Sequence, residues 1–252
     1  RFVARKKLIS ELKKNNKILK IVNNKMFLPV GDRSGEIIEP LLTFQWFLDT
    51  KKISVKVKKA IKEKKIVFHP NSWINTFKYW IENIEPWCIS RQIWWGHRIP
   101  IWYSNNGLKI AAKSEKEAID ILKLKDETDK ILYQDEDVLD TWFSSALWPF
   151  STLGWPENDK LLKNFYPSNV LVTGFDIIFF WVARMVMMGL EFMNEVPFKN
   201  IYIHPLVKDE KGQKMSKSKG NVIDPLDIIE KYGSDALRFT LTNLSTQGRD
   251  IK

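Results

Sequence analysis

Two short apolar runs on either side of a long apolar stretch constrain the fold more than any other feature of the sequence. Residues 169–172 and 200–204 have the length and composition of buried strands, and residues 176–193 are long enough for a buried helix. A strand, a helix and a second strand in this order form a right-handed βαβ unit with parallel strands. We therefore predict an α/β fold with a parallel sheet whose carboxyl edge, where such sheets bind ligands, follows both strands.

The same stretch is not expected to cross a membrane. Residues 170–192 are apolar overall, but Asp176 and Arg184 lie inside them and Gly174 interrupts their start. Charges at such depth are costly in a bilayer. A buried strand followed by a buried helix fits the stretch better.

The loop after the second strand carries a lysine pair suited to phosphate. A turn at residues 209–212 leads into the pentapeptide 214–218, in which Lys214 and Lys217 stand three residues apart. Their ammonium groups can converge on a polyphosphate. In a lysine-rich chain such a pair is more often a solvated loop, but its place beyond the ligand edge of the sheet favours an ATP site.

Composition narrows the setting and the partners. The chain has 252 residues, a formal net charge of +10, one cysteine and three histidines. One cysteine excludes an internal disulfide framework, and three scattered histidines offer no zinc-ligand spacing, so we expect no protein-bound zinc and a reducing, cytoplasmic setting. In residues 1–68 Lys and Arg outnumber Asp and Glu by about three to one. That surface suits RNA, although solvated helix faces give the same count.

The remaining pattern predicts several further elements. We expect helices over residues 1–15, 49–64 and 114–124 and one starting near Trp73, a hairpin pairing residues 18–21 with 26–29, and a strand at 99–103. Because the chain starts at Arg1 and ends without a tail, we interpret it as an excerpt of a longer protein. We expect divisions at residues 1–30, 31–165, 166–222 and 223–252.

Four motifs in order carry a resemblance to a known family. They are residues 86–100, rich in Trp and Arg; residues 140–145; the strand end and helix at 172–185; and the lysine loop with its flanks, 202–225. Together they resemble the class I aminoacyl-tRNA synthetases, in the branch that handles large aliphatic amino acids, and within it are most similar to the valyl enzymes. The resemblance covers the chain from about residue 31 onward.

The resemblance implies a fold and a reaction. The fold would be the second half of a Rossmann-like parallel nucleotide-binding sheet with an α+β connecting insertion. The reaction would be formation of valyl-adenylate from valine and ATP with Mg²⁺, then transfer of valine to tRNA(Val). Residues 1–30 would be the trailing end of an editing insert, and 223–252 the start of a helical region that contacts the tRNA stem. We expect a monomer in the full-length form and no membrane partner.

The resemblance also implies roles for individual residues. Two lysines would stabilise the phosphates during catalysis, nine residues would bind ATP, and three would form an apolar pocket for valine. The catalytic pair is Lys214 and Lys217; the ATP-binding set is Thr173, Gly174, Asp176, His204, Leu206, Val207, Met215, Ser216 and Ser218; the valine pocket is Trp142, Ile177 and Trp181. No metal-ligating residue is expected.

The sequence departs from the family pattern in one important respect. The His-x-Gly-His turn of the first βα unit, which forms the other half of the family's ATP site, is absent, and Gly96-His97 lies in the tryptophan-rich segment and does not replace it. We therefore expect the chain alone to activate valine very poorly.

Three alternatives remain open from the sequence. An isoleucyl or leucyl enzyme is opposed by residues 174–177 and by Trp181. A synthetase-derived RNA-binding module without catalysis would suit the basic first third, but the chain retains Lys214, Lys217, Asp176 and Trp142. A generic nucleotide-binding α/β domain explains the βαβ unit but not the tryptophan-rich segment.

Overall fold

The computed structural model describes residues 2–31, 34–124, 130–157, 160–216, 220–245 and 250–251. The chain divides into two compact units, residues 1–44 and 45–252. The division between residues 44 and 45 lies after the first division expected from the sequence, between residues 30 and 31.

The first unit contains one helix and little other regular structure. Helix α1 (Phe2–Lys14) confirms the helix expected at the start of the chain, yet none of its residues is buried. The expected hairpin of residues 18–21 and 26–29 is wrong: no strand forms there, and a single antiparallel bridge joins Val30 to Ile37. A lone two-stranded hairpin has no second layer to bury its apolar side chains, so apolar composition alone does not make it stable.

A three-stranded parallel sheet organises the second unit, in the order β2-β10-β9. Strands β9 (Ser168–Gly174) and β10 (Phe198–His204) pair in parallel, with His204 opposite Gly174. Strand β2 (Val67–His69) adds to the other side of β10, a strand that the sequence did not predict. The βαβ unit, the parallel sheet and the α/β fold are thus confirmed.

The connection between β9 and β10 is helical over residues 175–193, as expected, but only its middle is an α-helix. It runs through a 3₁₀ turn, a π-helical segment, an α-helix and a second π-helical segment: η1 (Phe175–Ile177), η2 (Ile178–Ala183), α8 (Arg184–Met188) and η3 (Gly189–Met193). π-Helical segments are rare and are found mostly at functional sites. The first of the two begins close to the carboxyl edge of the sheet.

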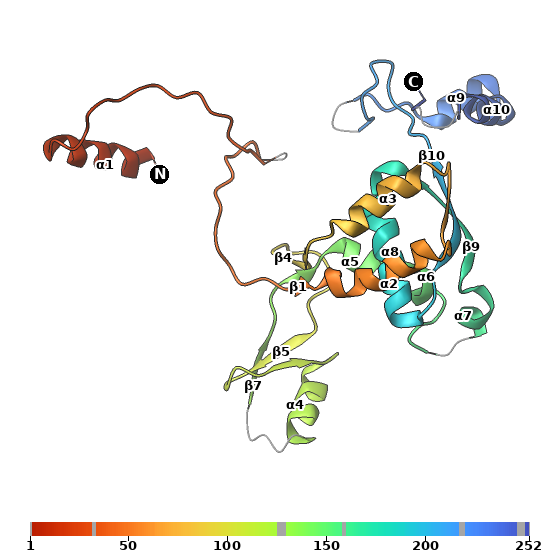
Figure 1. The fold of residues 1–252 in the computed structure, drawn as a ribbon, viewed down its shortest axis with the longest axis horizontal. Helices are drawn as coiled ribbons and strands as arrows, with labels where there is room; N and C mark the ends of the chain where they lie inside the picture. The colour runs from red at the N-terminus through yellow and green to blue at the C-terminus, as the bar shows by residue number, and fades with distance from the viewer. Residues whose placement is uncertain are drawn as a thin grey trace. The chain divides into compact units, whose positions relative to one another are not determined.

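Helices cover one face of this sheet (Figure 1). Helices α2 (Thr50–Lys62) and α3 (Trp73–Glu82) pack with η2 and α8 against it around a hydrophobic core. Its largest wholly buried side chains include Phe68, Phe77, Phe198 and Ile201. On β9 and β10, by contrast, Val170, Val172 and Tyr202 are exposed. Since parallel sheets are normally covered on both faces, this face is suited to a further layer.

The region between α3 and β9 consists of short antiparallel pairs and short helices. β1 pairs with β3, β4 with β8, and β5 with both β6 and β7. The strands are β1 (Phe47–Leu48), β3 (Trp87–Cys88), β4 (Ser90–Arg91), β5 (Ile101–Ser104), β6 (Lys109–Ala111), β7 (Ile131–Gln134) and β8 (Val138–Leu139). The helices are α4 (Glu115–Leu124), α5 (Thr141–Ser145), α6 (Trp148–Ser151) and α7 (Lys160–Phe165).

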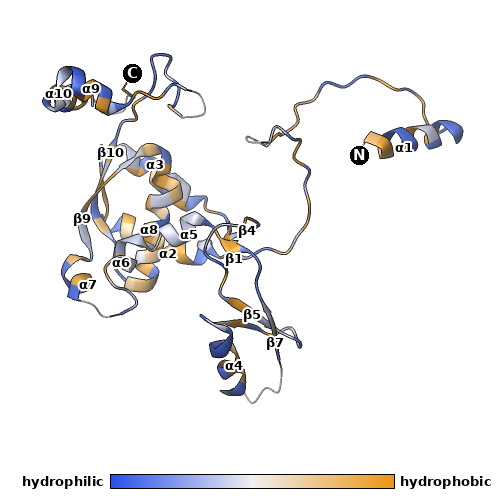
Figure 2. Cartoon of the chain, turned by 180° about the vertical axis from the view of Figure 1, so that it is seen from behind, coloured by the Kyte–Doolittle hydropathy of each residue, from blue (hydrophilic) through white to orange (hydrophobic). Residues whose placement is uncertain are grey.

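Helix α4 illustrates how the sequence sets a local boundary. The Ser114 hydroxyl accepts from the Glu117 N–H at 3.3 Å, and the Glu117 carboxylate accepts from the Lys113 N–H at 2.7 Å. This reciprocal cap starts the helix where the sequence placed it. In Figure 2, α4 is mostly hydrophilic and the neighbouring β5 is hydrophobic, as expected for a helix that presents only one stripe to a small sheet.

The chain continues past β10 into the lysine loop and then into two helices, α9 (Pro225–Tyr232) and α10 (Ser234–Leu244). Asp224 caps α9 by accepting from the Leu226 N–H at 2.9 Å. Neither helix buries a residue. Among the residues that the structure describes, no helix combines the length and apolarity needed to cross a bilayer.

Candidate functional site

The carboxyl ends of β9 and β10 bring predicted site residues together. Gly174 ends β9 beside His204, which ends β10. Asp176 follows in η1, and the Lys214 ammonium lies 3.3 Å from its Oδ2. We call Gly174, Asp176, His204 and Lys214 the sheet-edge site. Residues far apart in sequence therefore meet where a parallel sheet binds ligands.

The Lys214–Asp176 ion pair is exposed. The side chain of Lys214 is 77% accessible and that of Asp176 33%. Exposed pairs contribute only about 0–1 kcal/mol to stability. A ligand that separates the two charges at the sheet edge therefore loses little free energy by breaking the pair.

Gly174 is the position where the backbone needs to be without a side chain. A Cβ atom placed there would lie 2.7 Å from Asp176 Oδ1 and 3.3 Å from a Leu206 methyl carbon. Any larger residue would push the Asp176 carboxylate away from the strand end. Gly174 therefore allows the Asp176 carboxylate to lie against the end of β9.

The other predicted ATP-binding residues lie in different environments. Thr173 is only 3% exposed and belongs to the sheet interior, whereas Val207 is exposed. His204 Nδ1 lies 2.8 Å from the Pro205 carbonyl oxygen. Met215 and Ser216 are half-buried. Lys217 and Ser218 lie outside the described residues.

Residues 206–208 pair with the end of the chain. Ile251 N–H donates to the Leu206 carbonyl and Lys208 N–H to the Ile251 carbonyl, at 2.9 and 2.8 Å. In a parallel bridge of this kind the central residue, Val207, turns its own N–H and C=O to the opposite side. Of the predicted ATP-binding residues Leu206 and Val207, Leu206 is therefore engaged within the chain, and the backbone groups of Val207 point away from that pairing.

The three residues expected to bind valine lie on neighbouring elements, but among the described residues no ring contact joins Trp142 to Trp181. Trp142, on α5, stacks on Phe180 with ring centroids 6.0 Å apart. Trp181 packs on Trp148 at 5.6 Å and donates its indole N–H to the Ser145 carbonyl at 3.0 Å. Ile177 is half-buried just before the first π-helical segment. Phe180 and Trp148 were not singled out from the sequence.

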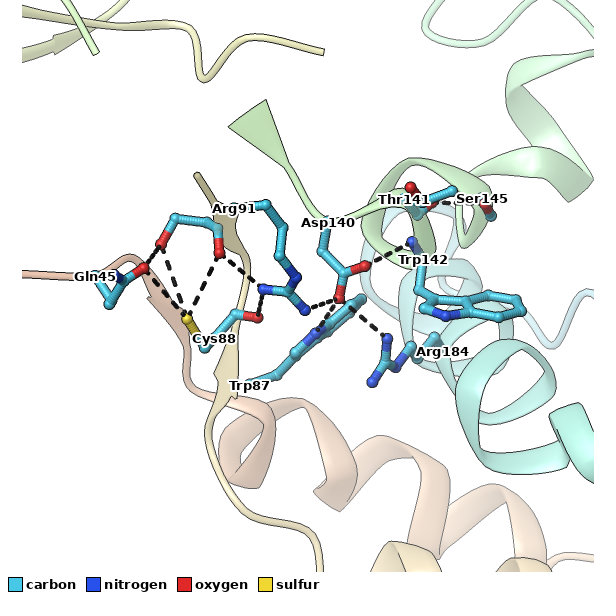
Figure 3. A network of polar contacts seen from close by, with 10 residues as sticks. Gln45, Trp87, Cys88, Arg91, Asp140, Thr141, Trp142, Ser145 and Arg184 are labelled. Atoms are coloured by element: carbon cyan, nitrogen blue, oxygen red, sulfur yellow. Dashed lines mark hydrogen bonds and ion pairs between the residues drawn. The ribbon is translucent and has the colours of Figure 1, made fainter. Parts of the chain in front are cut away.

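A partly buried polar network around Asp140 anchors the start of α5 (Figure 3). Asp140 Oδ2 accepts from Trp87 Nε1 at 2.9 Å and from Arg91 Nη2 at 2.6 Å, while Oδ1 accepts from the Trp142 N–H at 3.0 Å. Arg184 Nη1 lies 3.6 Å from the same carboxylate, and its guanidinium stacks 3.6 Å above the Trp87 ring. We call these five residues the Asp140 network.

Burial dominates the electrostatics of this network. It lowers the pKa of Arg184 to about 10, although the neighbouring Asp140 carboxylate raises it. Arg184 Nη1 has no hydrogen-bond partner within the described residues. The sequence analysis did not assign the network a role, yet a single arginine inside an apolar helix was a usable signal, because a buried cation needs a carboxylate nearby.

Within the described residues, no group of three or more His, Cys, Asp or Glu side chains is arranged to hold a metal ion. The sheet-edge site offers a lysine, a carboxylate and a glycine-lined backbone, a set suited to phosphates and hydroxyl groups.

Comparison with protein families and known proteins gives a consistent result. A family model described as tRNA synthetases class I (I, L, M and V) matches residues 3–252. The chain is 58% identical over 253 residues to a valine–tRNA ligase of Pelagibacter ubique and 55% identical over 252 residues to one of Caulobacter vibrioides. These matches cover 100% of this chain but only 29% and 28% of those proteins.

Solved structures agree on the fold. A methionyl-tRNA synthetase of Mycobacterium tuberculosis in complex with methionyl-adenylate superposes with a TM-score of 0.63 at 19% identity, covering 88% of this chain and 38% of that one. The LeuRS of a ternary LeuRS–tRNA–LeuAMS complex from Agrobacterium radiobacter K84 gives 0.56 at 20% identity, covering 70% and 28%. At these identities the likeness is one of fold, the Rossmann-like α/β architecture.

Proposed function

The chain belongs to the class I tRNA synthetases, and on this basis we propose that the protein containing it is a valine–tRNA ligase. Such an enzyme forms valyl-adenylate from valine and ATP and then transfers valine to tRNA(Val). The valine–tRNA ligases that match the whole chain support the choice of amino acid. Because the chain spans less than a third of their length, the activity is assigned to the longer protein.

The observation that carries the proposal is the meeting of Lys214 with Asp176 at the carboxyl edge of the parallel sheet, with Nζ 3.3 Å from Oδ2. A lysine and a carboxylate placed there suit two parts of a nucleotide. The ammonium can bind a phosphate, and the carboxylate can accept from a ribose hydroxyl. ATP would therefore separate the pair, with the Lys214 ammonium binding a phosphate and the Asp176 carboxylate accepting from the ribose.

The proposed chemistry needs no protein nucleophile. The valine carboxylate attacks the α-phosphorus of ATP, the bond to the bridging oxygen breaks, and pyrophosphate leaves with its charge. In the second step a ribose hydroxyl of the tRNA terminus attacks the adenylate carbonyl and AMP leaves. Lys214 and Lys217 would stabilise charge that develops on the leaving pyrophosphate, and the other site residues would position the reactants.

Mg²⁺ is proposed only as a companion of the ATP phosphates. Since the described residues offer no carboxylate cluster for it, no step is assigned to it. The remaining ATP contacts, from Thr173, Gly174, His204, Leu206, Val207, Met215, Ser216 and Ser218, remain proposals. So do a cytoplasmic location, a monomeric full-length protein and the divisions at residues 1–30, 31–165, 166–222 and 223–252.

We place the valine side chain near Trp142, Ile177 and Trp181, with Phe180 and Trp148 as supporting aromatic residues. The stacking of Trp142 on Phe180 and the packing of Trp181 on Trp148 support a rigid apolar wall. Such a wall can exclude isoleucine by size but cannot strongly reject threonine, which has nearly the same shape; valyl enzymes are themselves the standard illustration of this limit. A hydrolytic editing domain elsewhere in the protein would meet that need.

The chain would supply one half of the ATP site. The exposed face of β9 and β10, with Val170, Val172 and Tyr202, supports a missing layer, and the His-x-Gly-His turn is not among residues 1–252. The 252-residue chain alone should therefore show very little valine-dependent ATP–pyrophosphate exchange.

The deciding experiment is ATP–pyrophosphate exchange with the longest reading frame that contains this chain, comparing valine, isoleucine and threonine. Exchange that is highest with valine and detectable with threonine supports the proposal. Highest exchange with isoleucine or leucine would reassign the substrate. No exchange with any amino acid, together with retained RNA binding, would favour a noncatalytic RNA-binding module.

A further inference from the structure

The segment that presents Lys214 begins in a tight hairpin. Lys208 and Lys214 form an antiparallel bridge, and Asp209 N–H donates to the Gln213 carbonyl at 3.0 Å. Gly212 closes the turn with a φ of +74° and donates its N–H to the Asp209 carbonyl at 2.8 Å. The backbone of Lys214 is thereby restrained on its amino-terminal side.

Asn221 restrains the same segment from the other side. Its Oδ1 accepts from the Ser216 N–H at 2.9 Å, and its Nδ2 lies 3.4 Å from the Lys214 carbonyl oxygen. Gly220 has a φ of +65°, and a Cβ added to it would meet no atom within 4 Å, so the chain can turn back just before Asn221. One amide side chain thus spans both ends of a short loop.

The Asn221 amide is itself anchored on a carboxylate. Its Nδ2 donates to Asp209 Oδ2 at 2.8 Å, and Asp209 Oδ1 accepts from the Gln213 N–H at 2.6 Å. The hydrogen bond from Asn221, followed by that from Gln213, lowers the pKa of Asp209. The carboxylate is therefore charged at neutral pH, and hydrogen bonds to a charged group are the stronger kind.

We propose that Asp209 and Asn221 form a clasp that positions Lys214 for the phosphates of ATP, an inference that rests on the proposed function. The clasp fixes the backbone on both sides of Lys214, whose ammonium then reaches the sheet edge at Asp176. A long, exposed lysine side chain gains little orientation from its own ion pair. Its placement comes from the backbone that carries it, and Asp209 and Asn221 act as positioning residues.

The alternative is that Asn221 only stabilises a surface turn. A swap of the two groups separates the alternatives. Asn221→Asp alone sets two carboxylates against each other, and Asp209→Asn alone leaves one acceptor for two donors. In the double variant Asp209→Asn/Asn221→Asp, the amide and the carboxylate exchange places. The hydrogen bond between these two side chains and the one from the Ser216 N–H can then form again, and only the 3.4 Å contact with the Lys214 carbonyl is lost.

The first test uses limited trypsin digestion of the 252-residue chain and needs no activity. We expect Asn221→Ala and Asn221→Asp to speed cleavage after Lys214 about 10-fold or more, because each variant loses the Asn221 hydrogen bond to the charged Asp209 carboxylate, which is stronger than one between neutral groups. The double variant should recover most of the wild-type resistance to cleavage. Asn83→Ala is the matched control, because the Asn83 amide also donates one hydrogen bond, to the Tyr79 carbonyl at 2.8 Å.

The second test measures valine-dependent exchange in the longest reading frame. We expect Asn221→Ala to lower kcat about 10-fold while the KM for valine changes less than about twofold, since a displaced lysine weakens phosphate stabilisation without touching the valine pocket. The double variant should recover most of kcat. If Asn221 only stabilises a surface turn, Asn221→Ala should lower thermal stability without lowering kcat more than it changes the KM for valine.

The outcomes separate the clasp from the proposed function. If the wild-type protein shows no valine-dependent exchange, the proposed function fails, while trypsin cleavage still decides whether the clasp exists. If exchange is normal but Asn221→Ala matches the wild type in kcat and cleavage, the clasp is overturned. Failure of the double variant to recover either quantity overturns it as well.

Discussion

Asp140 and Asp176 show two opposite uses of the same side chain. The Asp140 side chain is 7% exposed and accepts hydrogen bonds from Trp87, Arg91 and the Trp142 backbone. The Asp176 side chain is 33% exposed and faces Lys214 at the sheet edge. A buried carboxylate is tolerated only when its donors are in place, so Asp140 serves the fold. Asp176 is sparsely paired and accessible, which suits a ligand.

The largest expected effect tests the first half of this comparison. Asp140→Ala should lower the free energy of unfolding by about 3–5 kcal/mol, because it leaves the Arg184 guanidinium buried without its counterion. Urea denaturation of the 252-residue chain measures the loss. Asp176→Ala is the matched control and should change stability by less than about 0.5 kcal/mol. Equal losses in the two variants would remove the distinction between the two aspartates.

The second prediction tests the sheet-edge site. Lys214→Ala should reduce kcat for valine-dependent exchange by about 10²- to 10³-fold, equivalent to about 2.7–4 kcal/mol, with stability nearly unchanged. Exchange in the longest reading frame is the measurement. Lys211→Ala serves as the control because Lys211 lies in the same hairpin but, among the described residues, forms no ion pair with Asp176. A comparable loss in both variants would mean that general positive charge, rather than Lys214, matters.

The elements predicted well are those whose pattern is complete within one segment. Residues 168–204 contain both strands and their connecting helix, so the βαβ unit could be inferred locally. Strand β2 could not, because its three residues are defined by pairing with β10, far along the chain. The hairpin at residues 18–29 failed for the converse reason: its sequence has strand character, but no layer among the described residues of its compact unit covers it.

The same reasoning applies to the candidate site. Lys214 and Asp176 were each placed at the sheet edge from the strand order, and their meeting follows from the fold. The Asp140 network joins residues from separate segments of the chain, so no local spacing reveals it. Asn221 stands directly after a glycine that follows the lysine loop, a turn signal that could have marked it as an anchor.

A smaller effect concerns the aromatic wall that we propose binds the valine side chain. Trp142→Ala should reduce discrimination between valine and isoleucine by about 10- to 100-fold in kcat/KM, because the lost ring leaves room for an extra methylene. The comparison of the two amino acids in the exchange assay measures it. Trp148→Phe preserves an aromatic partner for Trp181 and should leave discrimination within about twofold. If Trp148→Phe has the larger effect, the pocket is lined by Trp181 and Trp148 rather than by Trp142.

The smallest expected effect extends the comparison to a third aspartate, Asp135, which is 9% exposed. It accepts from Trp46 Nε1 at 2.8 Å and from the Tyr103 hydroxyl at 2.7 Å. Burial and this carboxylate raise the pKa of Tyr103 to about 12. Burial would raise the pKa of Asp135, but the hydrogen bonds from Trp46 and Tyr103 hold it below its usual value.

The pKa shifts of Asp135 and Tyr103 predict a loss of folding stability at acid pH and at alkaline pH, respectively. The Asp135 contribution is complete above the unfolded pKa of an aspartate and is lost as the pH falls through the lower folded value. The Tyr103 contribution is complete below the unfolded pKa of a tyrosine, near 10.0, and is lost as the pH rises toward about 12. Asp135 should therefore stabilise the fold over the whole neutral range.

Tyr103→Phe should lower the free energy of unfolding at pH 7 by about 1–2 kcal/mol, because it removes one hydrogen bond to a charged acceptor. In urea denaturation followed as a function of pH, the variant should also lose less stability than the wild type at alkaline pH and at acid pH. Tyr133→Phe is the control, since Tyr133 stacks on Tyr103 at 4.9 Å and is 53% exposed. A Tyr103→Phe protein with an unaltered loss of stability at alkaline pH would show that the Tyr103 hydroxyl does not stabilise the fold through Asp135, which would then rely on Trp46 and the Asp137 N–H.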